Sequence, residues 1–269
     1  AIGDVVLGAE FQVNTTTENA QTVAAVSGLA DGGYIIVWDS AEQDGDADGI
    51  FGQRYDADDN PVGTEFPVNT VTDGDQEFSA VTGLANGGFV VAWESDAGLT
   101  ADVNVVARVF DSNGDPLGAE FALHSLSLTN QDSVKIEALS NGGFAAVWES
   151  FLQDGLGEGV FMRQFDSAGS PVSGEIQVNT VTAADQHLPD VASLNDGGFV
   201  VAWESVGQDG DDGGIFFQRF DSDGVAQGVE TAVNTTTLRS QEEPTAVGLS
   251  DGGFVVMWDS QVAATFDED

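Results

Sequence analysis

Cysteine is absent and basic side chains are scarce in this chain of 269 residues. Without cysteine no disulfide can hold the fold together, and the sequence gives no redox indication of its compartment. Six lysines and arginines stand against 46 aspartates and glutamates, and Lys135 is the single lysine. The formal charge of -40 repels phosphates and anionic lipid headgroups. Nucleic acid and direct membrane insertion are therefore excluded as modes of action.

Long apolar runs are also missing. No stretch approaches the ~18 continuous apolar residues of a membrane-spanning helix, and the first residues lack the basic-then-apolar order of a secretory signal. We expect a soluble chain that is a mature fragment, with any anchor lying outside it. Repulsion among so many acidic groups is tolerable where salt screens it or divalent cations neutralise it. A marine, high-salt (halophilic) or calcium-rich exterior is the setting that this composition favours.

The sequence contains a strict internal repeat. Apolar residues make up 41% of the chain, which is enough for a core, and a glycine pair followed by an aromatic residue returns every 55 residues. The first glycines of these pairs are Gly32, Gly87, Gly142, Gly197 and Gly252. All five tryptophans share the period: Trp38, Trp93, Trp148, Trp203 and Trp258. Each repeat is therefore one supersecondary unit.

Every unit reads as four short strands separated by turn residues. In the second unit, runs rich in Val, Ile, Phe and Trp predict strands over about 78–84, 88–95, 104–111 and 119–124, with no helix. Both alternating faces of the second run are apolar, as Phe89 and Val90 illustrate. A strand of this kind is covered on both sides, so the sheets must be stacked.

Five four-stranded units with covered faces predict an all-β, five-bladed β-propeller. The chain starts before one E-F-x-V-N run and stops after a third-strand pattern, so each end holds part of one unit. We expect the N-terminal strand to complete the C-terminal blade and close the ring, whereas a straight solenoid would need atypical caps. The predicted single domain, 1–269, has blades at about 22–69, 78–124, 133–179, 189–234 and 244–267 plus 9–14.

The consensus resembles a family of bacterial secreted repeats. Its motif, GGFVVxW followed by QRFD and EFxVNT, is similar to repeats of large calcium-associated proteins that carry RTX or hemolysin-type calcium-binding repeats. The resemblance covers essentially the whole chain and implies an extracellular or cell-surface module of a larger bacterial protein. It implies little about the ligand, because propellers host unrelated functions.

Calcium binding is suggested by the stretch DGDADG at residues 44–49. Alternating aspartates followed by glycine let a tight loop bring several carboxylates to one point, as hard cations require. The candidate ligands are Asp44, Asp46 and Asp48 in the first blade and Asp209, Asp211 and Asp212 in the fourth. The alternative is a solvated polar turn, since Tyr55 stands where an EF-hand would place its bidentate glutamate.

Two further sets of residues are candidates for ligand binding. One is a ring of glutamines at the entry to each innermost strand: Gln21, Gln76, Gln131, Gln186 and Gln241. Their carboxamides could bind sugar hydroxyls, or they could cap backbone groups between blades. The other set is Lys135 and Asp190, which break the repeat on neighbouring inner strands. They could form an ion pair between blades or an asymmetric ligand site. His124 and His187 also break the pattern, and we assign both to packing or to the surface.

Three classes of function compete. A glycosidase would use carboxylates on the loop face as acid, base or nucleophile, with Asp75, Glu77, Asp132, Asp185, Glu242 and Glu243 as candidates. Equal blades without insertions argue against catalysis, which needs carboxyls in unlike environments. We therefore expect a non-enzymatic extracellular binding, adhesion or structural module, with lectin-like carbohydrate binding or a propeller glycosidase as alternatives. Other extracellular proteins, neighbouring domains, copies of itself or a polysaccharide are the expected partners.

Overall fold

Four antiparallel strands recur in the repeats of the computed structural model, which describes residues 10–97, 102–125 and 129–261. The first sheet contains β1 (Gln21–Gly28), β2 (Tyr34–Ala41), β3 (Asp48–Tyr55) and β4 (Pro61–Pro67). The second contains β5 (Gln76–Gly83), β6 (Phe89–Ser95), β7 (Asn104–Phe110) and β8 (Phe121–Ala122). The predicted strands of this unit are thus confirmed, with a shorter fourth strand.

The later repeats form three further sheets. The third sheet has β9 (Gln131–Ala138), β10 (Phe144–Phe151), β11 (Glu158–Phe165) and β12 (Ile176–Gln177). The fourth has β13 (Gln186–Ser193), β14 (Phe199–Val206), β15 (Gly213–Phe220) and β16 (Ala226–Ala232). The fifth has β17 (Gln241–Gly248) and β18 (Phe254–Ser260) alone. The described residues contain no helix, and hence none long and apolar enough to cross a membrane.

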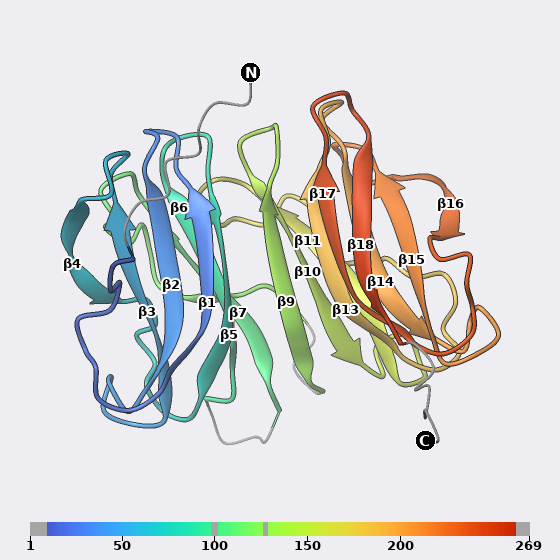
Figure 1. Cartoon of the computed structure of the whole chain (residues 1–269), viewed down its shortest axis with the longest axis horizontal. Coiled ribbons are helices and arrows are strands. Elements are labelled where there is room, and N and C mark those ends of the chain that lie inside the picture. The colour runs from blue at the N-terminus through green and yellow to red at the C-terminus, as the bar shows by residue number, and fades with distance from the viewer. Residues whose placement is uncertain (1–9, 98–101, 126–128, 262–269) are drawn as a thin grey trace, which may run out of the picture.

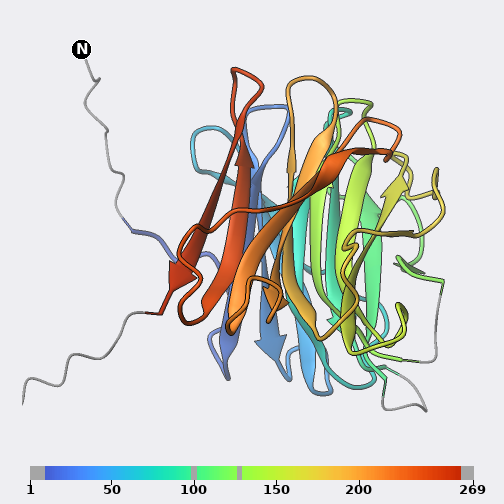
Figure 2. The same ribbon diagram turned by 90° about the vertical axis from the view of Figure 1, so that its right-hand side faces the viewer.

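The sheets stand side by side as blades, and their first strands line a common interior. β1, β5, β9, β13 and β17 contact one another in succession. Figure 1 shows β1, β9 and β17 running in the same direction, so their first residues lie at the same end of the molecule. Figure 2 shows the strands of neighbouring blades side by side, with the red sheet of β17 and β18 at one edge.

Apolar cores fill the spaces between neighbouring blades. One such core packs Val90 and Ala92 of β6 against Ile136 and Phe144 of the next blade. All residues from Phe89 to Trp93 are fully buried, which confirms that both faces of this strand are covered. Burying one large apolar side chain contributes about 1.5–3 kcal/mol, so each of these interfaces stabilises the fold substantially.

The glycine pairs are explained by the hairpin between the first two strands. Gly87 has a φ of 89°, which is costly for any residue with a side chain. Its neighbour Gly88 lies so close to the end of β7 that a Cβ would lie 2.3 Å from the carbonyl oxygen of Phe110. The same two demands recur in the first four blades, and Gly252 of the fifth keeps the positive φ.

Residues 10–14, part of the strand predicted at 9–14, form no strand in the structure. Their counterparts in the first blade lie at the end of β4, which pairs with the third strand of its own blade. For residues 10–14 that partner would be the predicted strand at 262–267, which lies outside the described residues. The predicted blade boundaries stay predictions.

In the first, third and fifth blades the repeated glutamine joins the first two strands through the tryptophan. In the second and fourth blades Gln76 and Gln186 accept from Asn69 and Asn179 instead. The Trp148 indole N–H donates to Gln131 Oε1 at 3.0 Å inside the protein, and Gln131 Nε2 donates to the carbonyl oxygen of Thr129 at 3.1 Å. Trp38 and Gln21 make the same bond at 2.9 Å near the surface.

We expect Gln131→Ala to lower the free energy of unfolding by about 1–3 kcal/mol, because a buried indole N–H then loses its acceptor. Urea denaturation monitored by tryptophan fluorescence measures this change. Gln21→Ala is the matched control and should cost less, since water can reach its indole. Equal losses in the two variants would contradict the explanation.

Candidate functional site

A cavity of about 650 Å³ opens where the innermost strands begin. Its wall is built by the first residues of β5, β9, β13 and β17 together with the ends of β6 and β10. The charged residues in this wall are Glu94, Asp132, Lys135, Glu149, Asp190 and Glu243. The cavity is therefore acidic and carries a single amine.

A bulge in each innermost strand shapes this wall. In β9 the pairing with β10 shifts register between Asp132 and Lys135, and Ser133 has a φ of 50°. The same shift recurs in the other inner strands, where Phe78, Leu188 and Glu243 have φ values of 55°, 49° and 53°. Non-glycine residues in this conformation are strained, and such residues concentrate at functional sites.

The strained residue is held by a carboxylate from the preceding blade. The backbone N–H of Phe78 donates to Asp39 at 2.8 Å, and that of Ser133 donates to Glu94 at 2.7 Å. The acceptor is the residue directly after the repeated tryptophan. We call these residues the junction carboxylates: Asp39, Glu94, Glu149 and Glu204. Glu149 accepts from Leu188 in the same way at 2.6 Å.

Burial raises the pKa of the junction carboxylates. Loss of hydration is the largest cause for each, and it brings the pKa of Asp39 to about 6 and those of Glu94 and Glu149 to about 7. The backbone N–H bonds favour the charged form and oppose this effect. These carboxyls can thus hold a proton near neutral pH.

Asp132 differs from them because no hydrogen bond to its carboxylate is found among the described residues. It is half-buried in the cavity wall, and burial followed by the charge of Glu158 raises its pKa to about 6. Its position in the repeat is occupied by Thr22, Glu77 and His187 in three other blades. Asp132 therefore lines the cavity without a hydrogen-bond partner among the described residues, and no other blade has aspartate at this place.

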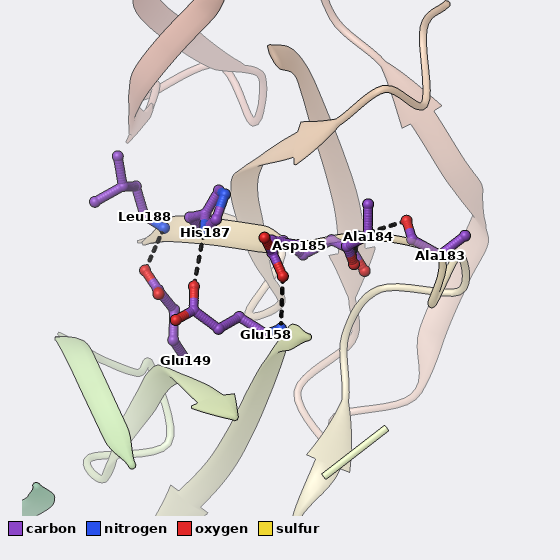
Figure 3. Close-up of polar contacts among 8 residues, drawn as sticks. Glu149, Glu158, Ala183, Ala184, Asp185, His187 and Leu188 are labelled. Carbon is purple, nitrogen blue, oxygen red and sulfur yellow. Dashed lines mark hydrogen bonds and ion pairs between the residues drawn. The ribbon is translucent and has the colours of Figure 1, made fainter. Parts of the chain in front are cut away.

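A second cluster lies between the third and fourth blades, at the edge of the cavity. Figure 3 shows His187 of β13 facing Glu158 of β11, with Glu149 of β10 beside them. His187 Nδ1 lies 2.8 Å from Glu158 Oε2, and one donor atom from each of the three residues lies within 4.8 Å of the others. Asp185 accepts the Glu158 backbone N–H at 3.1 Å.

The predicted calcium ligands of the first loop do not converge as a set. Asp44 accepts from the Asn69 amide at 3.0 Å, and Asp46 accepts from the Gly74 backbone at 3.2 Å. Asp48 instead lies with Asp75 and Glu77, three carboxylates whose oxygens are within 4.8 Å of one another.

In the fourth blade, Asp209 and Asp211 likewise accept from Asn234 and from the Arg239 backbone, at 2.8 and 2.7 Å. Neither they nor Asp212 belongs to a metal-sized cluster among the described residues. Calcium binding at these loops stays a prediction.

The glutamine ring lies behind the cavity wall rather than in it. Gln76, Gln131, Gln186 and Gln241 are at most 1% exposed. Gln21 is half-buried and also bonds to its tryptophan. In each of the five glutamines the side-chain Nε2 donates to a backbone carbonyl of the loop before its strand, which is the capping role given above as the alternative. Lys135 and Asp190 do line the cavity, but no ion pair joins them among the described residues. Asp190 accepts from the Ala246 backbone at 2.7 Å instead.

Sequence reasoning missed Glu94, Glu149 and the cluster around His187. Glu94 falls inside the apolar run 88–95, which predicts a core strand and hides the carboxylate. Glu158 and His187 occupy the same places in their repeats as Asp48 and Glu77. That these two places meet between adjacent blades is visible in the structure and not in the sequence.

No family model matches the sequence, and no curated protein matches it. Solved structures do share the fold. An α-L-arabinanase of Penicillium chrysogenum is 12% identical with a TM-score of 0.60, over 90% of this chain and 76% of its own. A GH93 α-L-arabinofuranosidase of Fusarium graminearum is 11% identical with a TM-score of 0.58, over 88% and 74%. An α-L-arabinofuranosidase from Lactobacillus brevis is 10% identical with a TM-score of 0.52, over 88% and 82%.

These matches correct the expected function. The sequence predicted a non-enzymatic binding, adhesion or structural module, whereas the solved structures that share the fold are named as glycosidases. The argument that equal blades oppose catalysis fails, because the blades are not equal: one place of the repeat holds Thr22, Glu77, Asp132, His187 and Glu242 in turn. The propeller glycosidase, given above as an alternative, agrees better with the findings.

We expect the protein to lose stability as the pH rises from about 4 to about 7. The pKa values of Asp39 and Glu94 are raised in the folded state, to about 6 and about 7. The folded chain therefore holds protons that the unfolded chain releases near pH 4, so its free energy of unfolding falls across this window.

Urea denaturation at pH 5 and pH 8 in 1 M NaCl tests this, since salt screens the long-range repulsion. Asp39→Asn keeps an acceptor for the Phe78 N–H and should reduce the pH dependence. Stability that increases from pH 5 to pH 8 would contradict the raised pKa values.

Proposed function

We propose that this chain is a glycoside hydrolase that cleaves neutral arabinofuranosyl linkages in its central cavity. The observation that carries the proposal is the pair of unlike carboxylates in the cavity wall. Asp132 has no hydrogen-bond partner among the described residues, whereas Glu94 is fixed by the Ser133 backbone. The glycosidases that share the fold support the choice of reaction, and their names supply the sugar.

The two carboxyls are assigned different tasks. Glycoside hydrolysis needs one carboxylic acid to protonate the leaving oxygen and one carboxylate to activate water or attack the sugar. Glu94, with a pKa of about 7, is the acid because it keeps a proton near neutral pH. Asp132, with a pKa of about 6, is the ionised partner.

The rest of the cavity suits a neutral sugar. Phe78 lines it with 51% of its surface exposed and offers a ring on which a sugar face can pack. Lys135 and Asp190 supply polar groups for hydroxyls. The overall charge of -40 opposes polysaccharides rich in carboxylates or sulfates, which favours a neutral polymer.

The proposal includes a closed ring of five blades. Val255 and Met257 of β18 are 41% and 58% exposed, although their counterparts in the other four blades are fully buried by the next blade. Val26 of β1 is 66% exposed, and its counterpart Ile136 is 8% exposed. The free faces of the fifth and first blades are thus the two halves of one repeated interface, and we propose that they meet.

A place outside the cell, within a larger secreted or surface protein that resembles the RTX-associated repeats, is also part of the proposal. The acidic composition supports it, since a high-salt or calcium-rich exterior screens the charge.

We expect Asp132→Asn and Glu94→Gln each to lower kcat at least 100-fold, because general acid and base groups contribute about 10²–10⁴-fold. The measurements are release of nitrophenol from an aryl α-L-arabinofuranoside and of reducing ends from linear arabinan.

Asp39→Asn is the matched control, since Asp39 makes the same backbone contact as Glu94 but does not line the cavity. Its kcat should stay within about twofold of the native value. An inactive native protein, or equal losses in all three variants, would contradict the assignment.

Ring closure predicts that Met257→Lys lowers the melting temperature by at least about 5 °C, because the charge must enter an apolar interface. Val229→Lys, at a side chain that is 80% exposed on β16, is the control and should change little. Differential scanning calorimetry of both variants, with sizing to confirm a monomer, gives the answer. Unchanged stability in Met257→Lys would show that this face stays free.

A further inference from the structure

We infer that His187, Glu149 and Glu158 form a binding site for one divalent transition-metal cation such as zinc. The three donors come from different strands of two blades, β10, β11 and β13. One nitrogen and two carboxylate oxygens lie within 4.8 Å of one another. This inference goes beyond the proposed hydrolysis and does not depend on it.

The distances suit a small cation. Zinc bonds to nitrogen and oxygen at about 2.0–2.2 Å, which places tetrahedral ligand atoms about 3.3 Å apart. His187 Nδ1 and Glu158 Oε2 are already 2.8 Å apart, and the Glu149 oxygen lies within reach of both. Small side-chain rotations therefore bring the three atoms around one ion (Figure 3).

The backbone around the donors fixes two of them in place. The Leu188 N–H donates to Glu149 Oε1 at 2.6 Å, and the Ser133 side chain also hydrogen-bonds to this carboxylate, so Glu149 is held from two sides. The Glu158 N–H donates to Asp185 at 3.1 Å, which holds the start of β11 against the loop before β13. Such outer contacts orient metal ligands in known sites.

Access and burial also fit a site that holds an ion and water. Glu149 is 5% exposed and forms the floor. The side chains of His187 and Glu158 are 26% and 31% exposed, so water can complete the coordination. Three protein ligands with an open position are typical of catalytic zinc sites.

Local charge favours a cation over a simple ion pair. His187 interacts electrostatically with Asp132 and Glu204 in addition to its contact with Glu158. One imidazole cannot balance these carboxylates together with Glu149, whereas a divalent ion adds two positive charges.

The nitrogen donor decides the kind of metal. Calcium and magnesium prefer oxygen ligands, while imidazole suits zinc and other first-row transition metals. The equivalent place between the first and second blades holds Asp48, Asp75 and Glu77, which are oxygen donors alone. His187 is what distinguishes the cluster between the third and fourth blades.

Titration of the metal-free full chain with zinc chloride, followed by isothermal calorimetry, tests the site. We expect one zinc per chain with a dissociation constant of about 10 µM or below, because three protein donors share one ion. His187→Gln and Glu158→Gln should each weaken binding at least tenfold. Zinc should also shift the His187 imidazole resonance in NMR spectra, which the His187→Gln variant identifies.

Glu242→Gln is the matched control. Glu242 occupies the same place as His187 in the next blade, where Gly213 and Ser240 replace Glu158 and Asp185. Its zinc affinity should equal that of the native chain, and circular dichroism should show all variants folded. No zinc binding, zinc affinity unchanged in His187→Gln, or tighter binding of calcium chloride than of zinc chloride would overturn the inference.

Discussion

The first four blades each send one carboxylate into the strained bulge of the following blade, and the geometry of the central cavity depends on this contact. Asp39, Glu94 and Glu149 all accept a backbone N–H from the residue with positive φ in the next innermost strand. The contact fixes the bulge, and the strained residues themselves line the cavity: Phe78, Ser133, Leu188 and Glu243. A buried charge is costly, so a carboxylate placed here also gains a raised pKa. The same buried carboxylate therefore holds two blades together and keeps a proton near neutral pH.

Most structural residues of the repeat are the same in every blade, whereas the residue before the bulge differs. The tryptophan, the glycine pair and the glutamine satisfy packing and turn requirements that are the same in every repeat. The residue before the bulge carries no such requirement and is Thr22, Glu77, Asp132, His187 or Glu242. Repetition therefore builds a regular frame in which one side chain per blade is free to differ, and of these five Asp132 lines the cavity. Asp132 and His187 give neighbouring blades different chemistry on nearly identical backbones.

The sequence predicted the strands because their causes are local. Alternating apolar residues, glycine pairs and a strict 55-residue period are enough to place four strands in a unit and to stack the units. The site was harder, because it depends on contacts between repeats. Glu94 meets Ser133 only after two blades pack, and neither residue is unusual in its own repeat. The aspartates of the first loop show the reverse case: their spacing predicts one ion site, and in the structure Asp44 and Asp46 bond to the next loop. Calcium binding there stays a prediction.

The strong acidity of the chain can be understood from the same contacts. Aspartates and glutamates join neighbouring blades in the loops as well as at the bulges. Glu65 accepts from the Thr15 hydroxyl, and Glu120 accepts in the same way from Thr70 in the next repeat. A carboxylate suits this task because it accepts several N–H and O–H bonds without donating any. Each added repeat therefore brings further carboxylates that bond neighbouring blades, and these carboxylates add negative charge. A fold assembled in this way gathers acidic groups, which attract cations and repel anions.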